Sequence, residues 1–310
     1  MNTFALWSTA LEANQALGRH YSPVMDQIAI ELKLSEWYGW LLPALVLEPE
    51  PISATRLRVR SPYTSARLYN EQLAKAAKQG FLTSIAEAEN EYHLTELGSQ
   101  AAERVIGAAY AKMTTLQPIS PAELEHLASL LHRLVMSCLT TPEPPGKWCI
   151  ILSRRTDPGD DASVVVRIDQ YLSDLAAFRD DAHLAAWQSH SIEGHIWEAF
   201  TYLWRGEATT LEGLYQKLER RGYSQDEYKQ ALENLIKRGW VKEEAGEYRV
   251  TPLGQEVRQA VEEATDRYFY GAWSCLSQGE TEEFKTLLIL LRDGLQPDSS
   301  IQARPTSGCS

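Results

Sequence analysis

A run of basic and hydroxyl side chains lies in the first third of the chain. Between Ile52 and Gly80 there are six lysines and arginines against one acidic residue, Glu71, although the whole chain of 310 residues carries a net charge of −12. Lysine and arginine neutralise the phosphates of nucleic acid, and hydroxyl and guanidinium groups also reach base edges. Phosphate contacts are expected from Arg56, Arg58, Arg60, Lys75 and Lys78, and groove contacts from Tyr63, Thr64, Ser65 and Arg67.

The same arginines have a second explanation. Arg56, Arg58 and Arg60 alternate with Leu57 and Val59, as on a solvated face that packs beside an acidic partner. The second half of the chain is the more acidic: residues 1–150 hold 12 basic and 15 acidic side chains, and the remainder holds 18 and 27. A solvated face against that half is therefore the alternative to contact with DNA.

A second candidate site lies in the segment 171–200. On a helix, Asp180, His183 and His190 would share one face, and a carboxylate with two imidazoles is a plausible ligand set for a divalent metal. No specific metal-binding signature accompanies them, so we expect inert polar contacts, with a metal-dependent enzyme as the alternative. The chain has no nucleophile elbow, phosphate-binding glycine loop, kinase motif or zincin motif. We therefore expect no enzymatic activity, no metal and no cofactor.

Aromatic residues gather in the second half of the chain. Rings at helical spacing usually form core, but the run "DRYFYGAW" cannot place all its rings on one stripe. Some of these rings are expected to pack against another helix, domain or subunit, and a pocket for a small-molecule effector is the alternative. The predicted pocket residues are Trp187, His190, Tyr268 and Trp273.

The basic run belongs to a segment whose pattern occurs twice. In each copy an amphipathic helix ends at a glycine, Gly80 or Gly239, as a left-handed residue after a helix requires. Two short strand-like runs follow, and then a threonine suited to cap the next helix. The second copy is the stretch "KRGWVKEEAGEYRVTPLGQEV", and the first is "KQGFLTSIAEAENEYHLTELGSQ", whose hairpin is three residues longer. The pattern predicts helix, hairpin and helix in both copies.

This order of helix, glycine, hairpin and capping threonine resembles the winged helix of the MarR-like transcription regulators. The resemblance covers roughly residues 53–116 and 192–270, with Thr95-x-Leu97-Gly98 and Thr251-x-Leu253-Gly254 as its repeated motif. It implies a tandem winged-helix protein that binds double-stranded DNA and regulates transcription in the cytoplasm. It also implies long helices after each hairpin that join the two copies, so that one chain would form a monomeric pseudo-dimer, or else a homodimer.

The two copies differ in charge at the start of the helix that would read DNA. In the second copy Asp226 and Glu227 stand where phosphate would approach, so that copy is expected to be structural or to pair with another subunit. DNA contact is therefore assigned to the first copy. Its hairpin carries Glu87, Glu89 and Glu91 without a basic residue, which favours the alternative of a non-catalytic ligand-binding or protein-interaction protein that does not read DNA.

The predicted fold is mainly α with short β-hairpin wings, as two winged-helix domains packed through long helices. The segment "TTPEPPGK" contains three prolines and a glycine, which end any helix. No apolar run is long enough for a membrane span, and the four scattered cysteines fit a reducing compartment. The predicted divisions are an N-terminal domain (1–139), a Pro-rich linker with an irregular or strand segment (140–168), a C-terminal domain (169–295) and a disordered tail (296–310).

Overall fold

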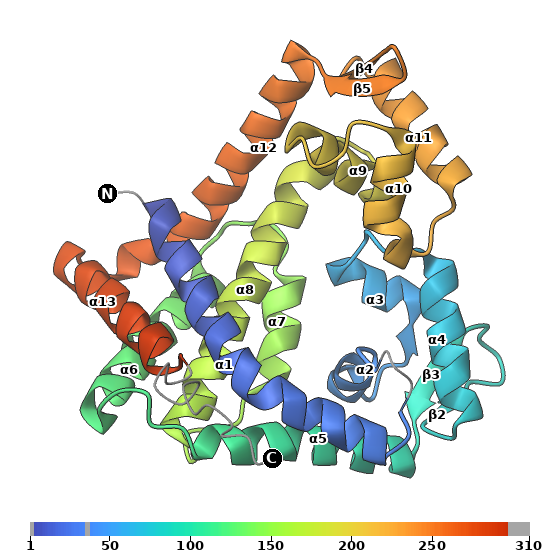
Figure 1. Ribbon diagram of the computed structural model, residues 1–310. Helices are drawn as coiled ribbons and strands as arrows, with labels where there is room; N and C mark the ends of the chain where they lie inside the picture. Colours follow the sequence, from blue (N-terminus) through green and yellow to red (C-terminus); the bar gives the residue numbers. More distant parts are fainter. Residues whose placement is uncertain (1–2, 35–37, 297–310) are drawn as a thin grey trace, which may run out of the picture.

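The computed structural model describes residues 3–34 and 38–296, and helices make up most of them (Figure 1). The expected mainly α fold with short hairpins is confirmed. The helices are α1 (Thr3–Glu31), α2 (Leu41–Leu47), α3 (Ala54–Arg60), α4 (Ala66–Lys78), α5 (Glu96–Thr114), α6 (Pro121–Thr140), α7 (Trp148–Ser153), α8 (Val164–Gln188), α9 (Gly194–Trp204), α10 (Leu211–Leu218), α11 (Gln225–Lys237), α12 (Pro252–Gly271) and α13 (Gln278–Gly294). Single turns of 3-10 helix form η1 (Arg154–Thr156), η2 (Glu219–Arg221) and η3 (Ala272–Cys275). The strands are β1 (Ile52–Ser53), β2 (Leu82–Ser84), β3 (Glu91–Leu94), β4 (Val241–Glu244) and β5 (Glu247–Val250).

Two segments of the chain have the same order of elements. The first runs α3, α4, β2, β3 and α5, and the second runs α10, α11, β4, β5 and α12. The helices α4 and α11 stop just before Gly80 and Gly239, whose φ angles of 85° and 73° lie in the left-handed region, so the predicted helix ends are confirmed. Both hairpins are antiparallel, as expected. The first gains a third strand, β1, which pairs with β3 and which the sequence did not predict.

The two threonines after the hairpins make matching hydrogen bonds. Thr95 caps α5 and Thr251 caps α12, and in each case the hydroxyl oxygen accepts from the backbone N–H three residues later at 3.1 Å. Each hydroxyl also donates, over 2.6 Å, to the carbonyl of the glycine that follows α4 or α11. One threonine side chain thus joins the end of one helix to the start of the next. These bonds fix the angle between α4 and α5 and the angle between α11 and α12.

One large apolar core joins both halves of the chain. The central helix α8 packs against α1, α6 and α12, and residues of α13 close the same core (Figure 1). A smaller core lies under the first segment around Trp40, Leu73 and Phe81. The predicted divisions at residues 139 and 169 therefore do not separate two cores, because α1 and α6 pack on α8. The predicted tail from residue 297 onward lies outside the described residues.

The segment 140–168, predicted as a linker with an irregular or strand-like part, has no strand; it is irregular at 141–147 and 157–163 and helical between and after these stretches. Residues 148–153 form α7, and the run "VVVRI" begins α8 at Val164. The carboxylate of Asp181 explains α7, because it accepts from the first-turn N–H groups of Cys149 and Ile150 at 2.8 and 2.9 Å. The β-branched run at the start of α8 locally favours a strand. The helical conformation is stabilised because it buries Val165 and Ile168 in the core.

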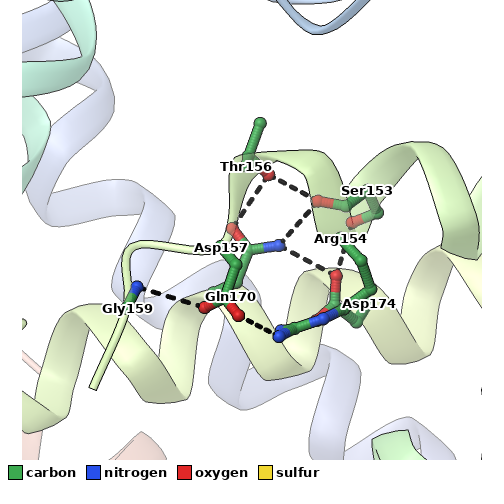
Figure 2. Close-up of polar contacts among 7 residues, drawn as sticks. All are labelled: Ser153, Arg154, Thr156, Asp157, Gly159, Gln170 and Asp174. Atoms are coloured by element: carbon green, nitrogen blue, oxygen red, sulfur yellow. Dashed lines mark hydrogen bonds and ion pairs between the residues drawn. The ribbon is translucent and has the colours of Figure 1, made fainter.

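A buried polar network fastens η1 to α8, as Figure 2 shows. Asp174 has no exposed surface, and its two oxygens accept from Ser153 at 2.7 Å, Arg154 at 2.9 Å and Gln170 at 2.8 Å. The amide oxygen of Gln170 accepts in turn from Thr156 at 3.0 Å. Burial raises the pKa of Asp174, while the three donors oppose that rise. The carboxylate is thus held by a full set of donors, which orients the turn after α7.

Candidate nucleic-acid interface

The second helix-turn-helix is built by α10, η2 and α11. Ser224 caps α11 through a capping box with Glu227, and Gly222 makes the turn with a φ of 76°. Tyr228 and Leu232 bury the inner face of α11. Hydrogen bonds from Ser224 hold the pKa of Glu227 below its usual value. The acidic start of this helix, which suggested a poor DNA reader, thus has a structural role.

The helices α3 and α4 of the first segment are arranged in the same manner as α10 and α11. Ser53 caps α3, and Ser65 caps α4 by accepting from the N–H of Leu68 at 3.1 Å. The hydroxyl of Ser65 was predicted to reach a groove. It is instead engaged by its own helix, and the residue is 4% exposed.

The helices α4 and α11 begin close to each other. They lie one beneath the other at the right of Figure 1, with their N-terminal ends together. The N–H of Ser65 donates to the carbonyl of Arg221 at 2.8 Å, and the guanidinium of Arg67 donates to the carbonyl of Gly222 at 2.5 Å. A Cβ on Gly222 would lie 2.7 Å from both Ser65 Oγ and Leu68 Cβ, so only glycine permits this approach. The backbones of the two units are therefore in direct contact.

Three arginines of the predicted DNA-contact set form ion pairs with the second half of the chain. The alternative of a basic face packed beside the acidic half is therefore the arrangement that the structure has. The partners come from α8, from the loop before α9 and from α11. The pairs are Arg58 with Glu193 (3.9 Å), Arg60 with Asp180 (2.8 Å) and Arg67 with Glu227 (3.5 Å).

Two further residues predicted to contact the groove are packed against the second half. Thr64 is 7% exposed and lies 3.4 Å from a guanidinium nitrogen of Arg221. The ring of Tyr63 lies 6.1 Å from that of Trp187, and burial raises the pKa of the Tyr63 hydroxyl. In this arrangement neither side chain can reach a base edge. The sequence could not reveal this, because the covering residues are more than 100 positions away.

The remaining cations of the predicted set are not covered. Lys75 and Lys78 are exposed in the last turn of α4, and Arg56 is half-buried on α3. None of the three forms an ion pair with any residue that the structure describes. These three remain available for phosphate contact.

The four residues predicted to line an effector pocket do not come together. Trp187 and His190 both stack on Trp197, near the end of α8. Trp273 packs instead against Phe284 of α13, in a different ring cluster. Two shallow grooves of about 390 Å³ lie elsewhere, one between α6 and α13 and one beside α2, α5 and η1, and none of the four predicted residues lines either. The structure thus brings Trp187 together with His190 but not with Trp273, and both tryptophans fill core positions.

A buried arginine lies in the first of these ring clusters and was missed from the sequence. Arg258 is 1% exposed, and its guanidinium carbon lies 4.7 Å from the ring centroids of both Trp197 and Trp204. One nitrogen donates to Glu262 at 2.7 Å, but Nε and Nη1 have no hydrogen-bond partner among the described residues. Burial lowers the pKa of Arg258. The two tryptophans thus take the place of hydrogen-bonding partners.

We expect Arg258→Met to leave the free energy of unfolding within about 1 kcal/mol of the parent or to raise it, because an apolar side chain of similar length loses no hydration on burial. Glu262 is 31% exposed and can be hydrated when its partner is removed. Arg258→Ala, which opens a cavity between the two tryptophans, should lower that free energy by about 2–4 kcal/mol. Urea denaturation followed by tryptophan fluorescence measures both. Equal losses in the two variants would show that the charge itself stabilises the fold.

The residues of the metal alternative are directed to different partners. Asp180 pairs with Arg60, whereas His183 lies 3.4 Å from the hydroxyl of Thr265 and His190 stacks on a tryptophan. Burial lowers the pKa of His183 to about 3. Within the described part of the chain, no three histidine, cysteine, aspartate or glutamate side chains are grouped closely enough to hold a metal ion. The geometry gives this alternative no support.

The comparison with known protein families concerns the second half of the chain. Residues 164–297 match the model of a helix-turn-helix family, and the match begins at the first residue of α8 and extends past α13. This part of the chain contains a helix-turn-helix domain. No curated protein and no solved structure matches the chain. Among the described helices, none is both long and apolar enough to cross a membrane.

Proposed function

We propose that the chain is a non-enzymatic, DNA-binding transcriptional regulator of the winged-helix type, similar to the MarR-like regulators and acting in the cytoplasm. The observation that carries the proposal is the helix-turn-helix match over residues 164–297, since this motif commonly binds DNA. The hairpin after α11 supplies the element that corresponds to a wing.

We further propose that the first segment is a second, duplicated winged helix. In its support, both segments place a left-handed glycine after the reading helix, cap the next helix with threonine, and make the same 2.6 Å hydrogen bond between them. The long helices that follow also meet: Arg133 of α6 binds Glu280 of α13 at 2.5 Å. A single chain would then have the arrangement that one-unit regulators obtain from two subunits.

The proposed DNA contacts are divided by accessibility. Arg56, Lys75 and Lys78 would bind phosphate in the described arrangement. The groove-reading part of α4 would become available only after the two units separate, because Ser65 and Arg67 are now bound to the loop before α11. Weak binding with little sequence preference is therefore expected of the described arrangement.

Retention on a random-sequence duplex tests the proposal. With about three phosphate contacts, the logarithm of the binding constant should fall with the logarithm of salt concentration with a slope of about −3. Lys75→Glu with Lys78→Glu should remove most of this binding. Arg19→Glu with Lys285→Glu makes the same change of charge on exposed residues of α1 and α13 and should not remove it. Fluorescence anisotropy of a labelled duplex between about 20 and 200 mM salt measures both.

A second function is favoured by the contact between α4 and α11. Both helices turn their N-terminal ends toward each other, as in a protein-interaction scaffold that keeps the helix-turn-helix fold without reading DNA. In that case no duplex retention should occur at any salt concentration, either for the parent or for the opened variant described below.

A further inference from the structure

The three ion pairs that join α3 and α4 to the second half of the chain have a consistent polarity. Each of the three basic side chains comes from the first helix-turn-helix, and each carboxylate comes from the second half of the chain. The basic partners Arg58 and Arg60 lie on α3, and Arg67 lies in the first turn of α4. These are positions from which a helix-turn-helix grips the phosphates on either side of a groove. The carboxylates therefore stand where phosphates would stand.

From this arrangement we propose an autoinhibitory contact: Asp180, Glu193 and Glu227 imitate phosphate and hold the first reading helix closed against the second half of the chain. The inference rests on the proposed DNA binding. It also gives a role to three carboxylates of the acidic second half, which lie opposite the basic run.

The interface combines backbone contacts, which fix its geometry, with ion pairs between partly exposed side chains. The Ser65–Arg221 backbone hydrogen bond and the close approach at Gly222 and Gly194 fix one relative placement; a Cβ on Gly194 would lie 2.5 Å from the carbonyl oxygen of Pro62. The three ion pairs are partly exposed, with side-chain exposures from 29% to 69%. Exposed pairs are weak singly and are weakened further by salt. Duplex DNA, with its dense row of phosphates, can therefore compete for the same arginines.

The test neutralises the carboxylates and leaves the arginines in place. The variant is Asp180→Asn, Glu193→Gln and Glu227→Gln, whose side chains keep the size of the originals, and glutamine at position 227 can still form the capping box. The control removes three negative charges elsewhere, with Glu103→Gln, Glu256→Gln and Glu282→Gln. Those three side chains are exposed and form no ion pair within the described residues. Any general gain in DNA affinity from charge alone appears equally in the control.

Two measurements report separately on opening of the interface and on DNA binding. Amide hydrogen exchange of the peptide spanning residues 61–69 reports opening, because the N–H of Ser65 is bonded across the interface. Duplex affinity at fixed low salt reports DNA binding. We expect exchange at this peptide to rise about tenfold over the control, and the dissociation constant to fall about tenfold, because the three weak pairs are lost together.

The outcomes distinguish a failure of the autoinhibitory contact from a failure of the proposed DNA-binding function. Unchanged exchange in the triple variant overturns the autoinhibitory contact whatever the DNA result. The contact is also overturned if exchange is faster, the control variant binds DNA, and the triple variant binds it no more tightly than the control. Opening would then expose nothing that binds DNA. Faster exchange without detectable DNA binding by the parent, the control or the variant overturns the proposed DNA-binding function instead.

Discussion

Gly98→Ala should lower the free energy of unfolding by about 3 kcal/mol or more, since overpacking against backbone cannot be relieved by a rotamer change. A Cβ at Gly98 would lie 2.2 Å from the carbonyl oxygen of Phe81, at the start of the first hairpin. Gly254→Ala should do the same in the second segment, where a Cβ would lie 2.2 Å from the carbonyl oxygen of Trp240. Urea denaturation followed by far-UV circular dichroism measures both losses.

The same helix offers a matched control. Gly107 also lies within α5, but a Cβ there would have no atom within 4 Å apart from its own helix. Gly107→Ala should therefore stabilise the chain by about 1 kcal/mol through helix propensity alone. A Gly98→Ala variant as stable as Gly107→Ala would contradict the packing of α5 against the hairpin. A loss at Gly98 without one at Gly254 would show that the two segments are not equivalent in packing.

The ends of the helices in the two repeated segments could be predicted from the sequence. Gly80 and Gly239 end their helices, and Thr95 and Thr251 start the next ones, as expected, because such signals act within a few residues. The helix after "TTPEPPGK" was not expected, because its N-terminal N–H groups are satisfied by Asp181, about 30 residues away. Local rules therefore predicted the elements but not the helix that depends on a distant cap.

The candidate site was predicted only in part for the same reason. The basic run was predicted either to contact DNA or to pack beside the acidic half, and three of its arginines have the second arrangement. Its described partners, such as Asp180 for Arg60, are protein carboxylates far along the chain, and charge counting alone cannot place them. The acidic start of α11 was likewise explained as a poor DNA reader, whereas Glu227 both caps its own helix and binds Arg67. Sequence composition indicated complementary halves, but only the fold shows which side chains meet.

Asp174→Ala should lower the free energy of unfolding by roughly 3–5 kcal/mol, because the donors of Ser153, Arg154 and Gln170 would all lose the acceptor that they share. Arg154 is 19% exposed and would retain Asp157 as a partner, but Ser153 and Gln170 would also lose their shared acceptor (Figure 2). The turn that connects α7 to α8 should then loosen. Urea denaturation gives the loss of stability, and hydrogen exchange of the peptide spanning residues 153–159 locates it.

The exposed aspartate of the same turn provides the control for this effect. Asp160→Ala removes a carboxylate that makes no ion pair within the described chain, so the free energy of unfolding should stay within about 0.5 kcal/mol of the parent. If Asp174→Ala were equally mild, the network would have to be replaceable by water, and the turn would be held by apolar contacts alone. If Asp174→Ala instead changed exchange at residues 61–69 as well, the turn would be coupled to the contact between the two helix-turn-helix units, because α8 carries both Asp174 and Asp180.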